Sequence, residues 1–228
     1  MEMLKRIVDN RRADSLATKL RQRRFALFVC LLASMPRPIK ILDIGGTQGF
    51  WERMNFTDEP GIEVVILNVS HLPTTYDNFI SVVGDARDMK AFADGEFDIV
   101  FSNSVIEHVG TYADQRRMAE EVQRVGKSYF IQTPNRYFPI EPHFLFPLFQ
   151  FLPLSVRAFL AHHFDLGWYK RIPDKHKATR EVAMIRLLTR RELAHLFPGA
   201  SIYKEKILGL TKSLIAYNRL AAVGKTEE

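Results

Sequence analysis

The chain reads Ile39-Lys40-Ile41-Leu42-Asp43-Ile44-Gly45-Gly46-Thr47-Gln48-Gly49 at its most informative point. An apolar run of this length is typical of a buried parallel strand, and the residues after Gly49 can begin a helix. In an open α/β sheet, ligands bind beyond the carboxyl ends of the strands, close to such a strand–loop–helix turn. Gly45, Gly46 and Gly49 carry no Cβ atom that would keep a ligand away from the backbone. The stretch therefore predicts a ligand-binding loop.

The residue spacing excludes two common kinds of nucleotide loop. A dinucleotide loop needs the pattern G-x-G-x-x-G, and counted from Gly45 the later positions hold Thr47 and Phe50. No lysine followed by serine or threonine comes after the loop, as a phosphate-cradling NTPase loop would require. The run D-x-G-x-T-x-G resembles instead the first motif of class I S-adenosylmethionine-dependent methyltransferases, with Thr47 in place of a glycine. A structural turn that serves no ligand is the alternative interpretation.

Strand and helix signals alternate along the chain. Apolar runs predict strands at 39–44, 62–69, 79–84, 97–102, 128–133, 200–208 and 212–217, and helical patterns lie at 15–33, 48–56, 112–125 and 189–197. Such alternation favours a doubly wound sheet with right-handed crossovers. The last two runs, joined near Gly209, predict a hairpin, which matches the antiparallel last strand of the resembled family. We therefore expect an α/β fold, a Rossmann-like, doubly wound, seven-stranded and mostly parallel sheet with an antiparallel last strand.

Residues 134–188 interrupt this alternation. They hold six prolines, which prevent long uninterrupted helices, together with seven phenylalanines and Trp168. We expect an inserted lid, rich in aromatic residues and proline, within a methyltransferase domain at 35–228. A basic helical cap at 1–34 would precede this domain. A plain packing subdomain is the alternative for the insertion.

The composition is that of an ordinary soluble chain of 228 residues, 46% hydrophobic and 25% charged. A single cysteine, Cys30, fits a reducing compartment, and the charged N-terminus shows no signal-peptide pattern, so we expect a cytoplasmic protein. Residues 1–24 hold eight basic and three acidic residues, most of the net charge of +6. We interpret this basic segment as the solvated face of a helix that covers the domain. Contact with an anionic membrane surface or with nucleic acid is the alternative.

The ends of the second and third strands match cofactor positions of the resembled family. Asn68 stands where family members usually carry an acidic residue for the ribose hydroxyls, and an amide can accept from one hydroxyl but lacks the charge. The resemblance implies that Asp85 accepts the exocyclic amine of adenine and that the Ala86 amide meets a ring nitrogen. A helix N-cap is the alternative role for Asp85.

The fourth segment runs from Phe97-Asp98-Ile99-Val100 to Glu107-His108-Val109. It resembles the type-11, ubiquinone-biosynthesis-like branch of these methyltransferases, and the resemblance spans roughly residues 39–135. It implies S-adenosylmethionine as the cofactor, with Asn103 and Ser104 beside the transferable methyl group. His108 would be structural or adjacent to the cofactor, and proton acceptance is its alternative role.

Methyl transfer to a hydroxyl requires a base with a pKa near the ambient pH, and histidine meets this need most readily. His143, in the proline-flanked first part of the insertion, is the candidate base. A histidine that pins the insertion by hydrogen bonding is the alternative. Tyr137 and Arg136 are candidate substrate contacts, and Arg136 would suit a carboxylate or phosphate. The adjacent His162 and His163 would diverge on a helix and make a poor metal pair, so no essential metal is expected.

The sequence therefore predicts a methyltransferase that acts on a small molecule, at oxygen, with an aromatic or lipid-linked acceptor. RNA methylation is an alternative suggested by the basic composition, but residues 103–106 lack the D/N-P-P-Y pattern typical of enzymes that methylate base amines. Nucleic acid is therefore not an expected partner. A non-catalytic binding module is the third alternative, supported only by Asn68 and Thr47. The acceptor's identity and the oligomeric state are not predicted.

Overall fold

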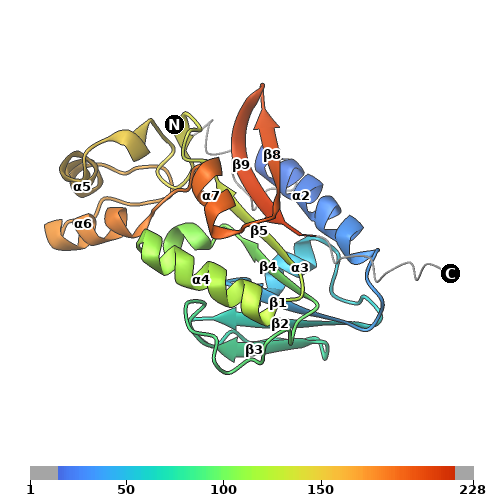
Figure 1. Ribbon diagram of the computed structural model, residues 1–228. Coiled ribbons are helices and arrows are strands. Elements are labelled where there is room, and N and C mark those ends of the chain that lie inside the picture. Colours follow the sequence, from blue (N-terminus) through green and yellow to red (C-terminus); the bar gives the residue numbers. More distant parts are fainter. Residues whose placement is uncertain (1–14, 219–228) are drawn as a thin grey trace.

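Seven strands form one sheet in the computed structural model, which describes residues 15–218 (Figure 1). Their order across the sheet is β3-β2-β1-β4-β5-β9-β8. β1 to β5 run parallel to one another, whereas β9 is antiparallel to both of its neighbours. The strands are β1 (Ile39–Ile44), β2 (Ile62–Asn68), β3 (Phe79–Val83), β4 (Ile99–Asn103), β5 (Tyr129–Pro134), β8 (Ser201–Ile207) and β9 (Leu210–Tyr217).

This sheet confirms the predicted α/β fold, including the hairpin that turns at Gly209 between β8 and β9. The apolar runs of β1 and β2 are continuous because helices cover both faces of the sheet, as in other parallel sheets. Most of the predicted bounds differ from the observed ones by one or two residues, and the helix after β1 by three. β4 begins at Ile99 rather than at Phe97, and the helix after β1 ends at Arg53, before Asn55 takes the left-handed φ of 52°.

Four helices cover the sheet in two layers (Figure 1): α2 (Leu16–Leu32), α3 (Gln48–Arg53), α4 (Tyr112–Val125) and α7 (Arg190–Leu196). Because successive strand residues point to opposite faces, each strand contributes to two cores. Ile41 packs with α2 and α3, whereas Leu42 packs with α4 and α7. The face under α2 is rich in aromatic rings that contact one another edge-on, such as Phe25 and Trp51 with centroids 5.8 Å apart.

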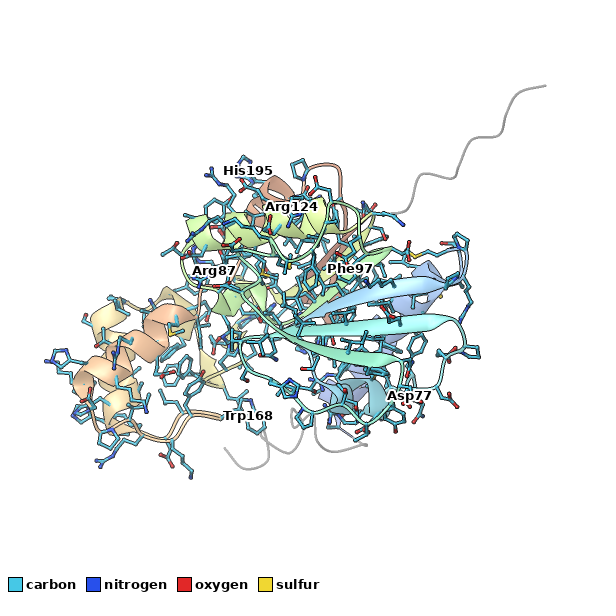
Figure 2. The ribbon with its side chains drawn as sticks, turned by 90° about the horizontal axis from the view of Figure 1, so that it is seen from below. Asp77, Arg87, Phe97, Arg124, Trp168 and His195 are labelled. Carbon is cyan, nitrogen blue, oxygen red and sulfur yellow. The ribbon has the colours of Figure 1, made fainter. Side chains whose placement is uncertain are left out.

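The insertion at 134–188 folds around its own small core. It contains two ten-residue helices, α5 (Leu154–His163) and α6 (Lys175–Met184), which lie to one side of the sheet (Figure 2). A two-stranded ribbon and a short 3₁₀ turn precede them: β6 (Ile140–Glu141), β7 (Phe146–Pro147) and η2 (Phe149–Phe151). Phe144 and Phe149 are buried in this core. Trp168, on the loop between α5 and α6, is 49% exposed. The insertion is thus held together partly by the aromatic residues that the sequence assigned to a lid.

The predicted basic cap at 1–34 is described only from Ser15 onward, and residues 1–14 lie outside the described part. The Ser15 hydroxyl accepts a hydrogen bond from Thr18 N at 3.1 Å and so caps α2. Phe28 and Leu31 on this helix are buried against the sheet, which confirms its covering role. Within residues 15–218, no helix has both the length and the apolar character needed to cross a membrane.

Candidate active site

The loop after β1 folds back over the carboxylate of Asp43. Alternation along β1 points this side chain to the face covered by α3, where Trp51 Nε1 donates a hydrogen bond to Asp43 Oδ2 at 2.7 Å. A Cβ atom at residue 46 would lie only 1.7 Å from the same oxygen, so only Gly46 lets the loop pass. Burial raises the pKa of Asp43 to about 7, although the Trp51 hydrogen bond acts in the opposite direction.

A cavity of about 190 Å³ lies beside this loop. It brings together four of the residues predicted to bind the cofactor with several that were not: Arg21, Asp43, Ile44, Gly45, Gly46, Thr47, Phe50, Arg53, Phe101 and Asn103. The other predicted cofactor residues, Gly49, Asn68, Asp85, Ala86 and Ser104, do not line it. At Gly49, the nearest atom to an added Cβ lies 3.4 Å away, so a glycine is not required there for space.

Two arginines of α2 were missed as site residues. Arg24 is buried, forms an ion pair from Nε to Glu205 Oε1 at 3.1 Å, and donates from Nη1 to Asn103 Oδ1 at 3.2 Å. Arg21 lines the cavity, and burial, together with the charges of Arg24 and Arg53, lowers its pKa to about 10. The prediction of a wholly solvated basic face is therefore wrong for these two residues. Their spacing contained a signal, because Arg21 and Arg24 stand three residues apart on the helix face that also carries Phe28.

Asn68 fixes the glycine loop. Its Nδ2 donates to Gly46 O at 3.2 Å, while its Oδ1 accepts from Val69 N at 2.8 Å. A hydrogen bond to a ribose hydroxyl would compete with these contacts, so the ribose role of Asn68 stays a prediction.

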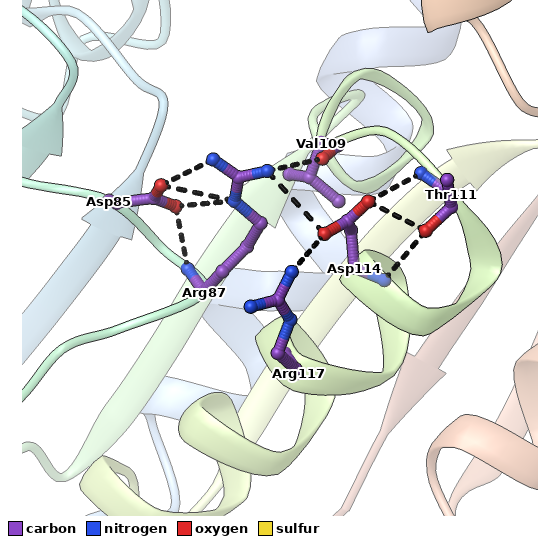
Figure 3. A network of polar contacts seen from close by, with 6 residues as sticks. All are labelled: Asp85, Arg87, Val109, Thr111, Asp114 and Arg117. Atoms are coloured by element: carbon purple, nitrogen blue, oxygen red, sulfur yellow. Dashed lines mark hydrogen bonds and ion pairs between the residues drawn. The ribbon is translucent and has the colours of Figure 1, made fainter.

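Asp85 forms an ion pair with Arg87, whose Nη2 lies 2.6 Å from Asp85 Oδ2 (Figure 3). This hydrogen-bonded pair holds the pKa of Asp85 below its usual range. The alternative role as a helix N-cap is wrong, because turns and not a helix follow Asp85. Ala86 is buried in the core under α4, 8% exposed. Their contacts with adenine stay predictions.

Ser104 follows β4 with a left-handed φ of 60°, and its hydroxyl donates to Gln132 Oε1 at 2.9 Å. The backbone N–H of Ser104 donates to Gln132 O at 3.0 Å. This strained link turns the chain from β4 into the 3₁₀ turn η1 (Ile106–His108). Tyr137 is 67% exposed and stacks on Phe151 with ring centroids 6.1 Å apart, so it lies on the surface of the insertion.

The structure brings two of the predicted catalytic residues, His108 and His143, into contact. Their rings meet edge-on with centroids 4.7 Å apart. His143 Nδ1 lies 2.6 Å from Glu141 Oε1, and Glu141 Oε2 also accepts from His143 N at 2.8 Å. Glu141 itself is buried, which makes it a fixed orienting group for the imidazole.

The electrostatic surroundings shift the pKa values of the two histidines in opposite directions. Burial lowers the pKa of His143, but the hydrogen bond and charge of Glu141, with the charge of Glu107, outweigh it and hold this pKa above its usual value. Burial and the charge of His143 lower the pKa of His108 to about 4. At neutral pH, His108 is therefore uncharged and a weak base, whereas His143, with its raised pKa, is the stronger base of the two.

Glu107 completes this cluster from the buried side. Thr133 Oγ1 donates to its Oε2 at 3.0 Å, whereas its Oε1 is buried and has no hydrogen-bond partner. Burial raises the pKa of Glu107 to about 7. One ligand atom from each of Glu107, His108 and His143 can lie within 4.8 Å of the other two, a set that could hold a divalent metal ion. No metal-ligand spacing is visible in the sequence, because His143 meets Glu107 and His108 only in the folded chain.

Comparisons with known proteins fit this geometry. Residues 42–129 match the family model described as "Methyltransferase domain". Uncharacterised proteins from two strains of Mycobacterium tuberculosis are 40% identical over 62 residues, 27% of this chain. The match spans only 21% of the length of these curated relatives.

Solved structures share the fold at low identity. The CurJ carbon methyltransferase has a TM-score of 0.55 at 14% identity, covering 89% of this chain and 54% of that one. A SAM-dependent methyltransferase from Methanosarcina mazei has a TM-score of 0.52 at 15% identity, covering 85% of this chain and 98% of that one. Residues 42–129 thus match a methyltransferase domain, and the order of the sheet matches the fold of these solved methyltransferases. The cofactor of this domain is S-adenosylmethionine.

Proposed function

We propose that the protein transfers a methyl group from S-adenosylmethionine to a hydroxyl oxygen of a small molecule, with His143 as the base. The observation that carries this proposal is the pair formed by His143 and buried Glu141, in contact with His108 just after β4. In an open α/β sheet, the carboxyl ends of the strands are where ligands bind.

The cavity beside the glycine loop fits the amino-acid end of the cofactor. Arg21 borders it with an Nε that is buried and makes no hydrogen bond, so its guanidinium can bind a carboxylate. Asp43 Oδ2 is taken by Trp51, while no hydrogen bond within residues 15–218 reaches Asp43 Oδ1. This oxygen is available to an ammonium group. A cation there would also favour the ionised form of a carboxyl that burial otherwise holds neutral.

The histidine cluster provides the proton transfer. When bound, the cofactor supplies a methyl group on a sulfonium sulfur. The sulfur keeps the electrons of the broken bond and becomes a neutral thioether. Because Glu141 accepts a hydrogen bond from the protonated Nδ1 of His143, the lone pair of Nε2 faces away from Glu141 and can accept the proton of the attacking hydroxyl. Neutral His108, in contact with this ring, can orient the hydroxyl by a hydrogen bond. Tyr137 is too exposed for a direct role without movement of the insertion, and its contact with substrate stays a proposal.

The test combines cofactor binding with turnover. Calorimetry should show that S-adenosylhomocysteine binds the wild-type protein and that Asp43→Ala abolishes this binding. Turnover is followed as release of S-adenosylhomocysteine with a panel of phenols and hydroxylated acids. His143→Ala should lower the best rate by roughly a hundredfold or more while the cofactor affinity is retained.

The matched control is His195→Ala, which removes an exposed histidine on α7 and should change neither quantity. An unchanged rate for His143→Ala, accompanied by a lower melting temperature, would contradict the base and support a histidine that pins the insertion. Failure of the wild-type protein to bind the cofactor at near-millimolar concentration would favour a non-catalytic binding module.

A further inference from the structure

A second and larger cavity, of about 700 Å³, lies between the amino end of α4 and the insertion. Pockets that hold small molecules commonly measure about 300–1,000 Å³. The cavity adjoins the histidine cluster, because Arg186, on its wall, donates from its backbone N to Glu107 O at 2.8 Å. Gly110, two residues after His108, also lines the cavity. The cavity wall is therefore joined to the segment that carries Glu107 and His108.

The charged groups of the cavity wall are four arginines and one carboxylate. The carboxylate, Asp114, is already neutralised from outside the cavity (Figure 3). It forms ion pairs with Arg117 and, at 3.5 Å, with Arg87, and its Oδ2 accepts from Thr111 Oγ1 at 2.6 Å. These hydrogen bonds and charges hold its pKa below the usual range. The ion pairs of Asp114 are thus with Arg87 and Arg117, neither of which lines the cavity.

Only one of the four arginines has an acidic partner. Arg186 forms an ion pair with Glu192 and donates to Gln115 Oε1 at 2.8 Å. Arg136, Arg157 and Arg180 form no ion pair with any acidic side chain of residues 15–218. These three guanidinium groups come from β5's end, α5 and α6, so the fold itself brings like charges to one cavity.

Two polar atoms at this cavity are buried and have no partner. Arg157 Nε makes no hydrogen bond, and only its Nη1 reaches a distant carbonyl, Val182 O at 3.4 Å. Gln150 donates from Nε2 to Arg136 O at 2.9 Å and to Phe138 O at 2.8 Å, which fixes the amide with its Oε1 buried and unpaired. Buried polar groups are normally hydrogen-bonded, so a donor and an acceptor are left for a ligand.

We propose that this cavity binds the phosphoryl or diphosphoryl group of a hydroxyl-bearing acceptor. Guanidinium forks match phosphate oxygens in pairs, and three cations that form no ion pair favour a group with two or more negative charges over a monocarboxylate. Arg157 Nε would donate to a phosphate oxygen, and Gln150 Oε1 would accept from a ligand hydroxyl. The assignment of this ligand as the methyl acceptor rests on the proposed function, whereas binding of the anion does not.

The test measures, by calorimetry, the binding of inorganic pyrophosphate to the full chain. Acetate at equal ionic strength is the comparison. Wild-type protein should bind pyrophosphate, and Arg136→Gln/Arg180→Gln should weaken this binding by about tenfold or more. Arg157→Lys keeps the charge but loses the fork, and should weaken it less. The matched control is Arg116→Gln, on the exposed side of α4, where Arg116 pairs with Glu120 at 3.4 Å; it should leave the affinity unchanged.

S-Adenosylhomocysteine is titrated into the same samples. Its affinity should be equal in all variants, which shows that each is folded and that the anion is held outside the cofactor cavity. Three results would overturn the proposal: no pyrophosphate binding at millimolar concentration, equal affinity in the double variant, or acetate binding as tightly as pyrophosphate. Loss of cofactor binding in the wild-type protein would count against the proposed function alone.

Discussion

Replacing Asp43 with asparagine should stabilise the protein at pH 8 and destabilise it at pH 4. Burial raises the pKa of this carboxyl from its ordinary value of 3.8 to about 7 in the folded state. The folded chain therefore holds the proton more tightly than the unfolded chain. The contribution of Asp43 to stability is fully present below about pH 4 and is lost as the pH rises through about 7.

The size of the effect follows from the same two pKa values. Their difference corresponds to about 4 kcal/mol of unfolding free energy that wild-type protein loses between pH 4 and pH 8. Asparagine does not ionise and keeps an oxygen for Trp51, but its amide N–H is left without an acceptor, at a cost of about 1–3 kcal/mol at every pH. The substitution should therefore add roughly 2 kcal/mol at pH 8 and remove roughly 2 kcal/mol at pH 4. For a chain of this length, that corresponds to about 4–8 °C in melting temperature in each direction.

Thermal unfolding of both proteins at the two pH values measures this reversal. The control is Asp77→Asn, which removes an exposed carboxylate (Figure 2) and should shift unfolding by less than about 0.5 kcal/mol. Asp43→Asn should at the same time weaken binding of S-adenosylhomocysteine, since the ammonium loses a charged partner. A melting difference of the same sign and size at both pH values would refute the reasoning.

Three further predictions concern the loop and the histidine cluster. Glu141→Gln should lower the pKa of His143, so that the acidic limb of the pH–rate profile, expected above pH 6.5 in wild type, moves to lower pH; a limb that does not move would contradict the orienting role. Gly46→Ala should unfold the protein or lower its melting temperature by about 10 °C or more, because its Cβ would lie 1.7 Å from a buried carboxylate oxygen; circular dichroism measures this, and an unperturbed melting curve would argue against the loop geometry. Added Zn²⁺ should bind Glu107, His108 and His143 and slow methyl transfer, because the metal occupies the lone pair of the base. Co²⁺ serves as the spectroscopic probe of this site, and an absorption spectrum that is unchanged in His108→Ala would place the metal elsewhere.

The fold could be predicted from the sequence because its signals are local. Each parallel strand is a short, mainly apolar run, and the turn after β1 needs glycine where the backbone crosses a side chain. The capping box of α4, in which Thr111 and Asp114 bond to each other's backbone, is also readable from adjacent residues. These features depend on neighbours in the chain.

The site was less predictable because its contacts join distant segments. Glu141 stands two residues from His143 and could have been paired with it, whereas His108 meets His143 only when the insertion returns to the end of β4. The partner of Arg24, Glu205, lies 181 positions later in the chain. Asp85 shows the opposite case, since its partner Arg87 is a near neighbour whose charge competes with the role that the resemblance implied.

The ion pair between Arg24 and Glu205 ties α2 to β8, one of the last strands to leave the ribosome. Until that strand has formed, the buried guanidinium of Arg24 lacks this counter-charge, although the aromatic side of α2 can already pack against β1, β4 and β5. The ion pair therefore completes the docking of α2 only after β8 has been synthesised. Deleting the hairpin of β8 and β9 should therefore expose α2 to proteases under conditions in which the parallel strands stay folded.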